Sequence, residues 1–190
     1  MKLCLIGHSF KYELEKLIRI FLPFEKIEFA EEAADGDGTA VTRLDKTADK
    51  TVLSALLLIN GKSYNKSYEL SNDAVDYNNE CERLLAVALY DCFVSASGYV
   101  PEWGILTGVR PAKLFSRLAA ENGEANAENW FKNALKVGDE KISLCRSTVV
   151  SEGKITSLSR PDSFSLYISI PFCPTRCSYC SFVSHSVENA

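Results

Sequence analysis

The stretch TVLSALLLINGKSYNKSYEL, residues 51–70, decides the first part of the fold. An Asn-Gly pair, Asn60 and Gly61, separates two runs that each have the composition of a β-strand. A type I′ turn needs a positive φ at both of its central residues, and Asn-Gly is the pair that adopts this geometry most readily. The stretch therefore predicts a β-hairpin that turns at residues 60–61.

The residues at the start of the chain have the pattern of a short strand followed by a helix. Residues 2–7, KLCLIG, are typical of a strand. In residues 11–24, KYELEKLIRIFLPF, apolar side chains recur with the i, i+3, i+4, i+7 spacing of an amphipathic helix, at Leu14, Leu17, Ile18 and Phe21. Pro23 is expected to stop this helix, because proline has no N–H to continue its hydrogen bonds.

Two further segments complete an expected small α+β unit over residues 1–70. Residues 26–31, KIEFAE, have the composition of a second strand. Residues 31–40, EEAADGDGTA, have the composition of an acidic, glycine-bearing loop. The strands, the helix and the hairpin together predict a sheet with one amphipathic helix packed on it.

Residues 71–160 are expected to be mostly helical. From Cys81 onward, apolar residues form a stripe with a period of 3.6 residues, made of Leu84, Leu85, Ala88, Leu89, Cys92, Phe93 and Ala96. The stripe puts Cys81 and Cys92 on the buried face, where a cysteine behaves as a small apolar residue. Cys145 on a later helix and Cys4 in the first strand are assigned to the core in the same way.

A second group of helices is predicted after residues 101–115, PEWGILTGVRPAKLF. Pro111 is well placed as a first helical residue, because the N–H that proline lacks would have no partner within the helix. Arg110 precedes this proline and is therefore expected to be extended. A further helix is predicted to end near Gly138, with Asp139 capping the next one.

The composition excludes several classes of function. The chain has 190 residues and a formal net charge of −4, so it lacks the basic surplus of a nucleic-acid-binding protein. Its apolar runs, such as residues 55–59, are far shorter than a membrane span. We therefore expect a cytoplasmic protein with no nucleic-acid or membrane partner. Seven cysteines without a secretory signal favour metal binding or catalysis over a disulfide framework.

The third part of the chain, residues 161–190, carries three of these cysteines. Residues 165–170, SLYISI, are expected to form a strand. A C-x3-C-x2-C loop follows it and contains Cys173, Cys177 and Cys180. Three thiolates on one short loop suit an iron–sulfur cluster. A four-iron cluster held by three protein ligands would keep one iron open for a small chelating molecule.

A closed zinc site is the main alternative for this loop. His185 follows the three cysteines closely, so the four residues could form a Cys3His site. Structural zinc sites usually take paired ligands from two separate loops, and the sequence offers no second pair upstream. A disulfide within the loop is disfavoured by the expected compartment.

The cysteine spacing, with the aromatic Tyr179 before the last cysteine, resembles the signature of the radical S-adenosylmethionine (SAM) superfamily. Residues 166–182, LYISIPFCPTRCSYCSF, resemble more specifically the Y-x-H-I-P-F-C-x3-C-x2-C motif of oxygen-independent coproporphyrinogen III oxidases. The matches are Tyr167, Ile170, Pro171, Phe172 and the three cysteines. WGILTGVRPAKL and VGDEKISLC, upstream of this loop, make the chain similar to the HemZ-type coproporphyrinogen dehydrogenase branch.

The resemblance implies two cofactors. Cys173, Cys177 and Cys180 would ligate a [4Fe–4S] cluster, SAM would chelate the open iron, and Tyr167 and Tyr179 would lie against SAM. Reductive cleavage of SAM would give a deoxyadenosyl radical that takes hydrogen from a substrate propionate. Loss of CO₂ would then leave a vinyl group and convert coproporphyrinogen III to protoporphyrinogen IX in haem biosynthesis. The implied partners are a porphyrinogen substrate and an electron donor, and no catalytic side chain is assigned.

One position departs from the oxidase motif, because Ser169 stands where that motif has histidine. A small residue there fits the HemZ-type branch better, and it keeps a haem-chaperone-like relative with the same loop as an alternative. Arg110, before a helix N-terminus, is a candidate for contact with the carboxylates of the substrate.

The resemblance also implies the fold of the third part. Radical SAM cores are series of βα units curved into a partial barrel, and a full (β/α)₈ barrel needs about 250 residues. We therefore expect residues 161–190 to provide only the first strand and the cluster loop of a truncated radical SAM barrel. On this expectation the chain is an N-terminal fragment that is inactive alone.

Overall fold

The computed structural model describes residues 1–32, 35–108, 110–160, 162–175, 177, 180 and 185–187. It is a mixed α+β structure, as the sequence predicted, and it divides into two compact units, Met1–Gly153 and Lys154–Ala190.

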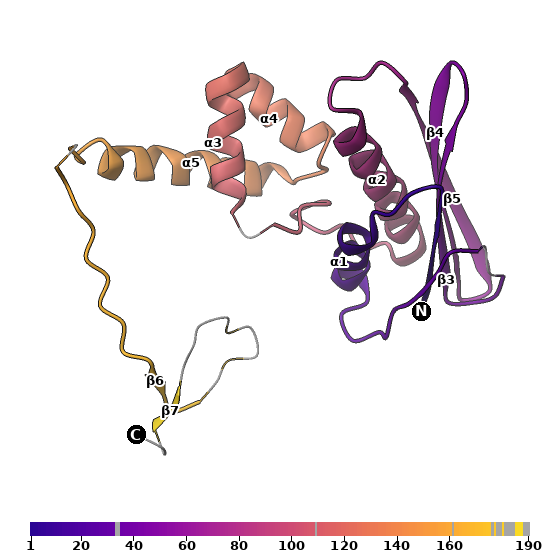
Figure 1. The fold of residues 1–190 in the computed structure, drawn as a ribbon, viewed down its shortest axis with the longest axis horizontal. Helices are drawn as coiled ribbons and strands as arrows, with labels where there is room; N and C mark the ends of the chain where they lie inside the picture. Colours follow the sequence, from indigo (N-terminus) through magenta and orange to yellow (C-terminus); the bar gives the residue numbers. More distant parts are fainter. Residues whose placement is uncertain are drawn as a thin grey trace. The chain divides into compact units, whose positions relative to one another are not determined.

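A five-stranded mixed sheet forms one layer of the first unit (Figure 1). Its strand order is β2-β1-β3-β4-β5, with β1 Lys2–Ile6, β2 Glu28–Ala30, β3 Thr39–Lys46, β4 Lys50–Ile59 and β5 Lys62–Ser71. Strand β1 pairs in parallel with β2 and β3. The β3–β4 and β4–β5 pairs are antiparallel. The helix between β1 and β2 therefore serves as a crossover connection between parallel neighbours.

The predicted hairpin is confirmed. Ile59 pairs with Lys62, so only Asn60 and Gly61 lie in the loop between β4 and β5. Their φ values are 54° and 67°, both positive, as a type I′ turn requires.

The predictions for the first thirty residues are also confirmed, because β1, β2 and helix α1 (Lys11–Phe21) lie where the sequence placed them. Three side chains of α1 are fully buried, those of Leu14, Leu17 and Ile18. The helix ends with the N–H of Leu22 donating to the carbonyl of Ile18 at 2.8 Å, just before Pro23.

Strand β3 was not predicted, and the assignment of residues 31–40 to a loop was wrong at Thr39 and Ala40. The first four residues of β3 are all buried, since β3 lies between β1 and β4 in the middle of the sheet. A strand buried on both faces loses the alternation of apolar and polar residues that reveals a half-exposed strand.

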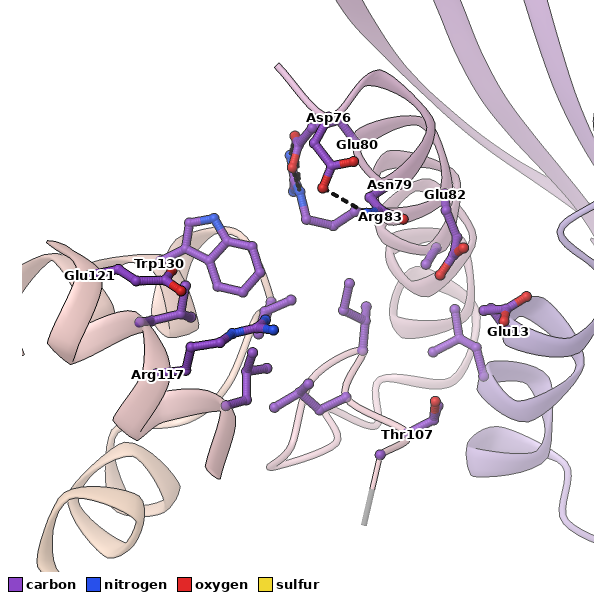
Figure 2. A pocket seen from close by; sticks show the side chains of 18 residues that line it. Glu13, Asp76, Asn79, Glu80, Glu82, Arg83, Thr107, Arg117, Glu121 and Trp130 are labelled. Atoms are coloured by element: carbon purple, nitrogen blue, oxygen red, sulfur yellow. Dashed lines mark hydrogen bonds and ion pairs between the residues drawn. The ribbon is translucent and has the colours of Figure 1, made fainter. Parts of the chain in front are cut away.

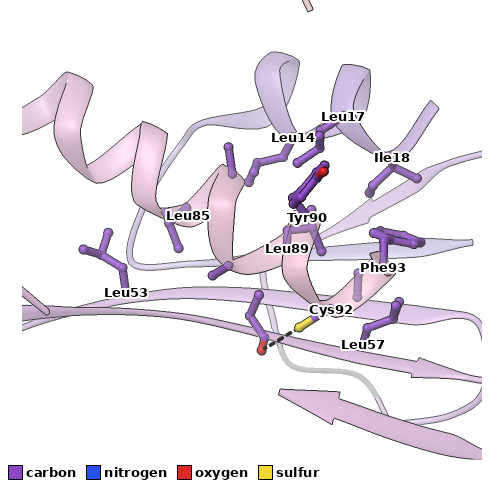
Figure 3. Close-up of a cluster of buried hydrophobic side chains, with 14 of the residues drawn as sticks. Leu14, Leu17, Ile18, Leu53, Leu57, Leu85, Leu89, Tyr90, Cys92 and Phe93 are labelled. Atoms are coloured by element: carbon purple, nitrogen blue, oxygen red, sulfur yellow. Dashed lines mark hydrogen bonds between the residues drawn. The ribbon is translucent and has the colours of Figure 1, made fainter. Parts of the chain in front are cut away.

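Helix α2 (Tyr77–Ser97) packs against the same face of the sheet as α1 (Figures 1 and 3). Its apolar stripe is buried as predicted except at Ala96, which is partly buried. The buried residues include Cys81 and Cys92, and the thiol of Cys92 donates to the carbonyl of Ala55 at 3.5 Å. Phe21 of α1 stacks on Phe93 of α2 with ring centroids 4.9 Å apart. The two helices and the sheet therefore share one hydrophobic core.

A second core joins helices α3 (Pro111–Asn122), α4 (Glu124–Asn133) and α5 (Asp139–Thr156). Phe115 and Phe131 meet edge to face at its centre, with ring centroids 5.3 Å apart. Pro111 is the first residue of α3 and Cys145 is buried, which confirms both predictions.

The segment after α2 connects the two cores. The N–H of Ile105 donates to the carbonyl of Leu135 at 2.9 Å, and Ile105 contacts both clusters. Gly104 has a φ of 56°, and a Cβ there would lie 2.0 Å from the carbonyl oxygen of Leu135. Only glycine allows so close an approach of the two backbones.

Among its described residues, the second unit contains one short parallel strand pair, β6 (Phe172–Cys173) and β7 (His185–Ser186). The expected strand at residues 165–170 is not formed in this structure, in which β6 begins only at Phe172. The side chains of Leu166, Tyr167, Ile168 and Ile170 are 77–80% exposed. A strand needs a neighbour to take its backbone hydrogen bonds, and no described strand pairs with this segment.

The predicted division of the chain at residues 70 and 160 stays a prediction. In the described part of the chain, no helix combines the length and apolarity that crossing a membrane requires.

A hydrogen-bonded chain links the end of β1 to β3. The N–H of Phe10 donates to Nδ1 of His8 at 3.3 Å, so the ring proton lies on Nε2, which is 3.1 Å from Oγ1 of Thr42. The hydroxyl of Thr42 donates in turn to the carbonyl of Cys4 at 3.2 Å. Burial lowers the pKa of His8 below its ordinary 6.5, because a charged imidazole would lose hydration there.

The lowered pKa of His8 predicts that the stability of the protein depends on pH. As the pH falls through about 6.5, the unfolded chain binds a proton at His8 more readily than the folded chain, so the free energy of unfolding decreases. His8→Gln keeps hydrogen-bonding groups at this position and removes the titration. Urea unfolding of both proteins between pH 7.5 and 5 should show a smaller loss of stability in His8→Gln. Equal losses in the two proteins would contradict this assignment.

Candidate functional site

The cysteine loop begins and ends at the β6–β7 strand pair. Phe172 pairs with His185 and Cys173 with Ser186, and the N–H of His185 donates to the carbonyl of Pro171 at 2.7 Å. The described residues on either side of positions 174–184 therefore lie side by side, with Cys173 in β6 itself.

The three predicted ligands are accessible to a cofactor from solvent. Cys173 and Cys177 are exposed and Cys180 is partly exposed. The N–H of Cys180 donates to the carbonyl of Cys177 at 3.0 Å, which brings the backbones of these two residues together. The donor set of three accessible thiols fits an iron–sulfur cluster chemically.

The structure does not assemble a metal centre from the described residues, among which no group of three His, Cys, Asp or Glu side chains is placed to hold an ion. The assignment of Cys173, Cys177 and Cys180 as ligands stays a prediction. Of the two predicted SAM contacts, Tyr167 is 78% exposed, and Tyr179 lies outside the described residues.

The strand pair also bears on the zinc alternative. The rings of Phe172 and His185 are neighbours, with centroids 6.0 Å apart. Successive side chains of a strand point to opposite faces, so Cys173 points away from the face that Phe172 shares with His185. This arrangement favours a ligand set of three cysteines over a set that includes His185.

The upstream cysteines have a different chemical character. Cys4, Cys81, Cys92 and Cys145 are all buried and none is in a disulfide. Burial raises the pKa of the thiols of Cys81 and Cys145, and burial with the charge of Asp91 raises that of Cys92 to about 12. Metal ligation needs the thiolate, so these three protonated thiols are poor ligands. The loop cysteines are the accessible ones.

Two of the cavities in the first unit bear on the function, and neither is lined by a residue of the cysteine loop. One, of about 450 Å³, lies at the start of α3 and is lined by Arg110, Lys113, Ser116 and Glu152 among others. Arg110 is the residue that we predicted to contact the carboxylates of the substrate, and this role stays a prediction. The other, of about 480 Å³, is lined by residues from α1, α2, α3 and α4 (Figure 2). Sequence reasoning missed it, because its walls come from segments more than a hundred residues apart.

A comparison with curated proteins finds a similar protein whose name refers to coproporphyrinogen-III oxidase. The chain is 38% identical over 95 residues to the oxygen-independent coproporphyrinogen-III oxidase-like protein HemZ of Bacillus subtilis.

The aligned region covers 48% of this chain and 19% of the HemZ protein, so the chain spans about a fifth of the length of its relative. No family model matches the chain, and no solved structure matches it significantly. The alignment, which covers 48% of the chain, agrees with the HemZ-type resemblance that the motifs indicated.

The difference in exposure predicts which thiols react in the native protein. Cys173 and Cys177 should be modified first by a small thiol reagent such as iodoacetamide, because they are exposed. Cys4, Cys81, Cys92 and Cys145 should react only after unfolding. Peptide mass mapping after brief anaerobic labelling measures this order, with fully denatured protein as the control. Rapid native labelling of Cys92 would contradict the packing of α2.

Proposed function

We propose that the protein is a radical SAM oxidoreductase of the coproporphyrinogen dehydrogenase type, acting in haem biosynthesis. The observation that carries the proposal is the C-x3-C-x2-C loop with its accessible thiols, together with the similarity to a coproporphyrinogen-III oxidase-like protein. The name of that relative supports the substrate class, and the loop supports the type of cofactor.

The chain's own part in this proposal is to hold and orient the cofactors. Cys173, Cys177 and Cys180 would bind a [4Fe–4S] cluster through their thiolates and leave one iron open for SAM. The bound cluster and SAM would supply the electron transfer and hydrogen abstraction that start decarboxylation of the substrate propionates. Tyr167 and Tyr179 would contact SAM. The β6–β7 pair would fix the two ends of the loop.

The apolar segment before β6, residues 166–170, is also part of this proposal. Residues 166–170 carry consecutive exposed apolar side chains, broken by Ser169. Strands of parallel sheets are covered on both faces and have such compositions. We propose that this segment is the first strand of a radical SAM (β/α) barrel and that it pairs with later strands of that barrel. In this proposal an electron donor is a required partner.

Ser169 stands where the oxidase motif has histidine, and this difference favours a second candidate function, that of a haem-chaperone-like radical SAM protein with the same loop. A zinc-stabilised module without catalytic activity is the third, since His185 lies near the start of the loop in space. The strand geometry described above disfavours His185 as a ligand together with Cys173.

Anaerobic reconstitution with iron and sulfide tests the cluster. The chain should bind about four irons, the content of a cubane cluster, and show broad visible absorption. Cys173→Ala, Cys177→Ala and Cys180→Ala should each lose most of the iron. Cys145→Ala is the matched control, because it removes a buried thiol and should keep the iron. Binding of zinc in stoichiometric amount, with no iron, would contradict the proposal.

Turnover by the intact gene product separates the two radical SAM alternatives. Incubation with coproporphyrinogen III, SAM and a reductant under anaerobic conditions should form protoporphyrinogen IX, measured by chromatography after oxidation to the porphyrin. Cys177→Ala should abolish the product and Cys145→Ala should retain it. A protein that carries the cluster and binds haem, but forms no product, would favour the haem-chaperone-like function instead.

A further inference from the structure

The cavity between the first two helices and the α3–α4 pair has the features of a ligand site. Its volume is about 480 Å³, within the range of small-molecule pockets. Its apolar wall includes Ile105, Leu106, Leu114, Leu118 and Trp130, all of them partly exposed. Partly exposed apolar side chains that converge on one hollow can bury surface against a ligand.

Two carboxylates face each other at one end of this cavity (Figure 2). Glu13 lies in the first turn of α1, where the helix dipole favours a negative charge. Glu82 lies on α2, and both burial and the charge of Glu13 raise the pKa of its carboxyl. Within the described part of the chain, neither carboxylate forms an ion pair or a hydrogen bond. Two like charges held together beside an apolar wall destabilise the fold unless a cation joins them.

The cations near this pair do not neutralise it. Arg83 donates to both carboxylate oxygens of Glu80 and, at 3.1 Å, to the carbonyl of Ala134. Arg117 stands on the α3 wall and pairs with no described carboxylate. The lining as a whole has five acidic side chains against these two basic ones, those of Glu13, Asp76, Glu80, Glu82 and Glu121. The cavity is therefore negative as well as apolar.

We infer that this cavity binds a small organic cation, whose ammonium or guanidinium group lies between Glu13 and Glu82 and whose apolar body lies against Leu114, Leu118 and Trp130. The cation relieves the repulsion between the two carboxylates, and the apolar body covers the exposed wall. This site is independent of the proposed function, since it uses no residue of the cysteine loop.

Trp130 provides a local reporter for the test. The chain has two tryptophans, Trp103 and Trp130, so Trp103→Phe leaves the one that lines the cavity as the only source of tryptophan fluorescence. The probe is 2-phenylethylammonium, and its neutral match is 2-phenylethanol, which has the same ring and chain length. The ammonium should change the fluorescence of Trp130 saturably and bind at least about tenfold more tightly than the alcohol, a factor worth about 1.4 kcal/mol.

The carboxylate requirement is tested by substitution in the same background. Glu82→Gln should weaken binding of the ammonium about tenfold and leave the alcohol unaffected. Glu32→Gln, which removes one exposed acidic charge elsewhere, is the control and should leave binding unchanged. Glu82→Gln should also unfold at a slightly higher temperature, because it removes the repulsion with Glu13, so failure to fold would not explain a loss of binding.

Three outcomes would overturn the inference. The alcohol could bind as tightly as the ammonium, which would show an apolar pocket without charge recognition. Glu82→Gln could leave the affinity for the ammonium unchanged. A capped Leu-Lys-Leu peptide could bind with dependence on Glu82 while the small amine does not, which would identify a basic protein segment as the occupant.

Discussion

The packing of helix α2 on the sheet is the interaction on which the rest of the first unit depends. Ten of its side chains are buried, and they contact α1 on one side and the strands on the other. Fully burying a large apolar side chain stabilises a fold by roughly 1.5–3 kcal/mol, so this one helix contributes much of the first core. The polar side of α2 also contacts the second group of helices, because Arg83 donates to the carbonyl of Ala134. The charged pair Glu13 and Glu82 exists only because α1 and α2 share this face of the sheet.

Local signals in the sequence gave reliable predictions where one residue or one period determines the structure. The Asn60-Gly61 turn follows from the positive φ that few other residues adopt, and the position of Pro111 follows from its missing N–H. The periods of α1 and α2 identified their buried faces, including the positions of Cys81 and Cys92. These features need no knowledge of what lies across the fold.

The sequence was less informative where a structure depends on neighbours. Strand β3 was missed because a central strand has no polar face to reveal it, although Thr39, Val41 and Thr42 are the β-branched residues that strands favour. The strand at residues 165–170 was predicted from its composition, but composition does not supply the partner that a strand requires. The negative cavity could not be predicted, since its residues converge only when both helical groups are in place. Of the candidate site, the sequence predicted the ligands, whereas the structure adds that the loop ends are paired and that its thiols are accessible.

We propose that the cysteine loop holds a cluster with one open iron at which SAM binds. Electron paramagnetic resonance of the reduced, reconstituted intact protein, recorded with and without SAM, tests it most directly. We expect the spectrum of a reduced [4Fe–4S] cluster whose g values change when SAM is added, because SAM would then coordinate the iron that no cysteine ligates. A cluster signal that SAM leaves unchanged, or no cluster signal at all, would contradict it.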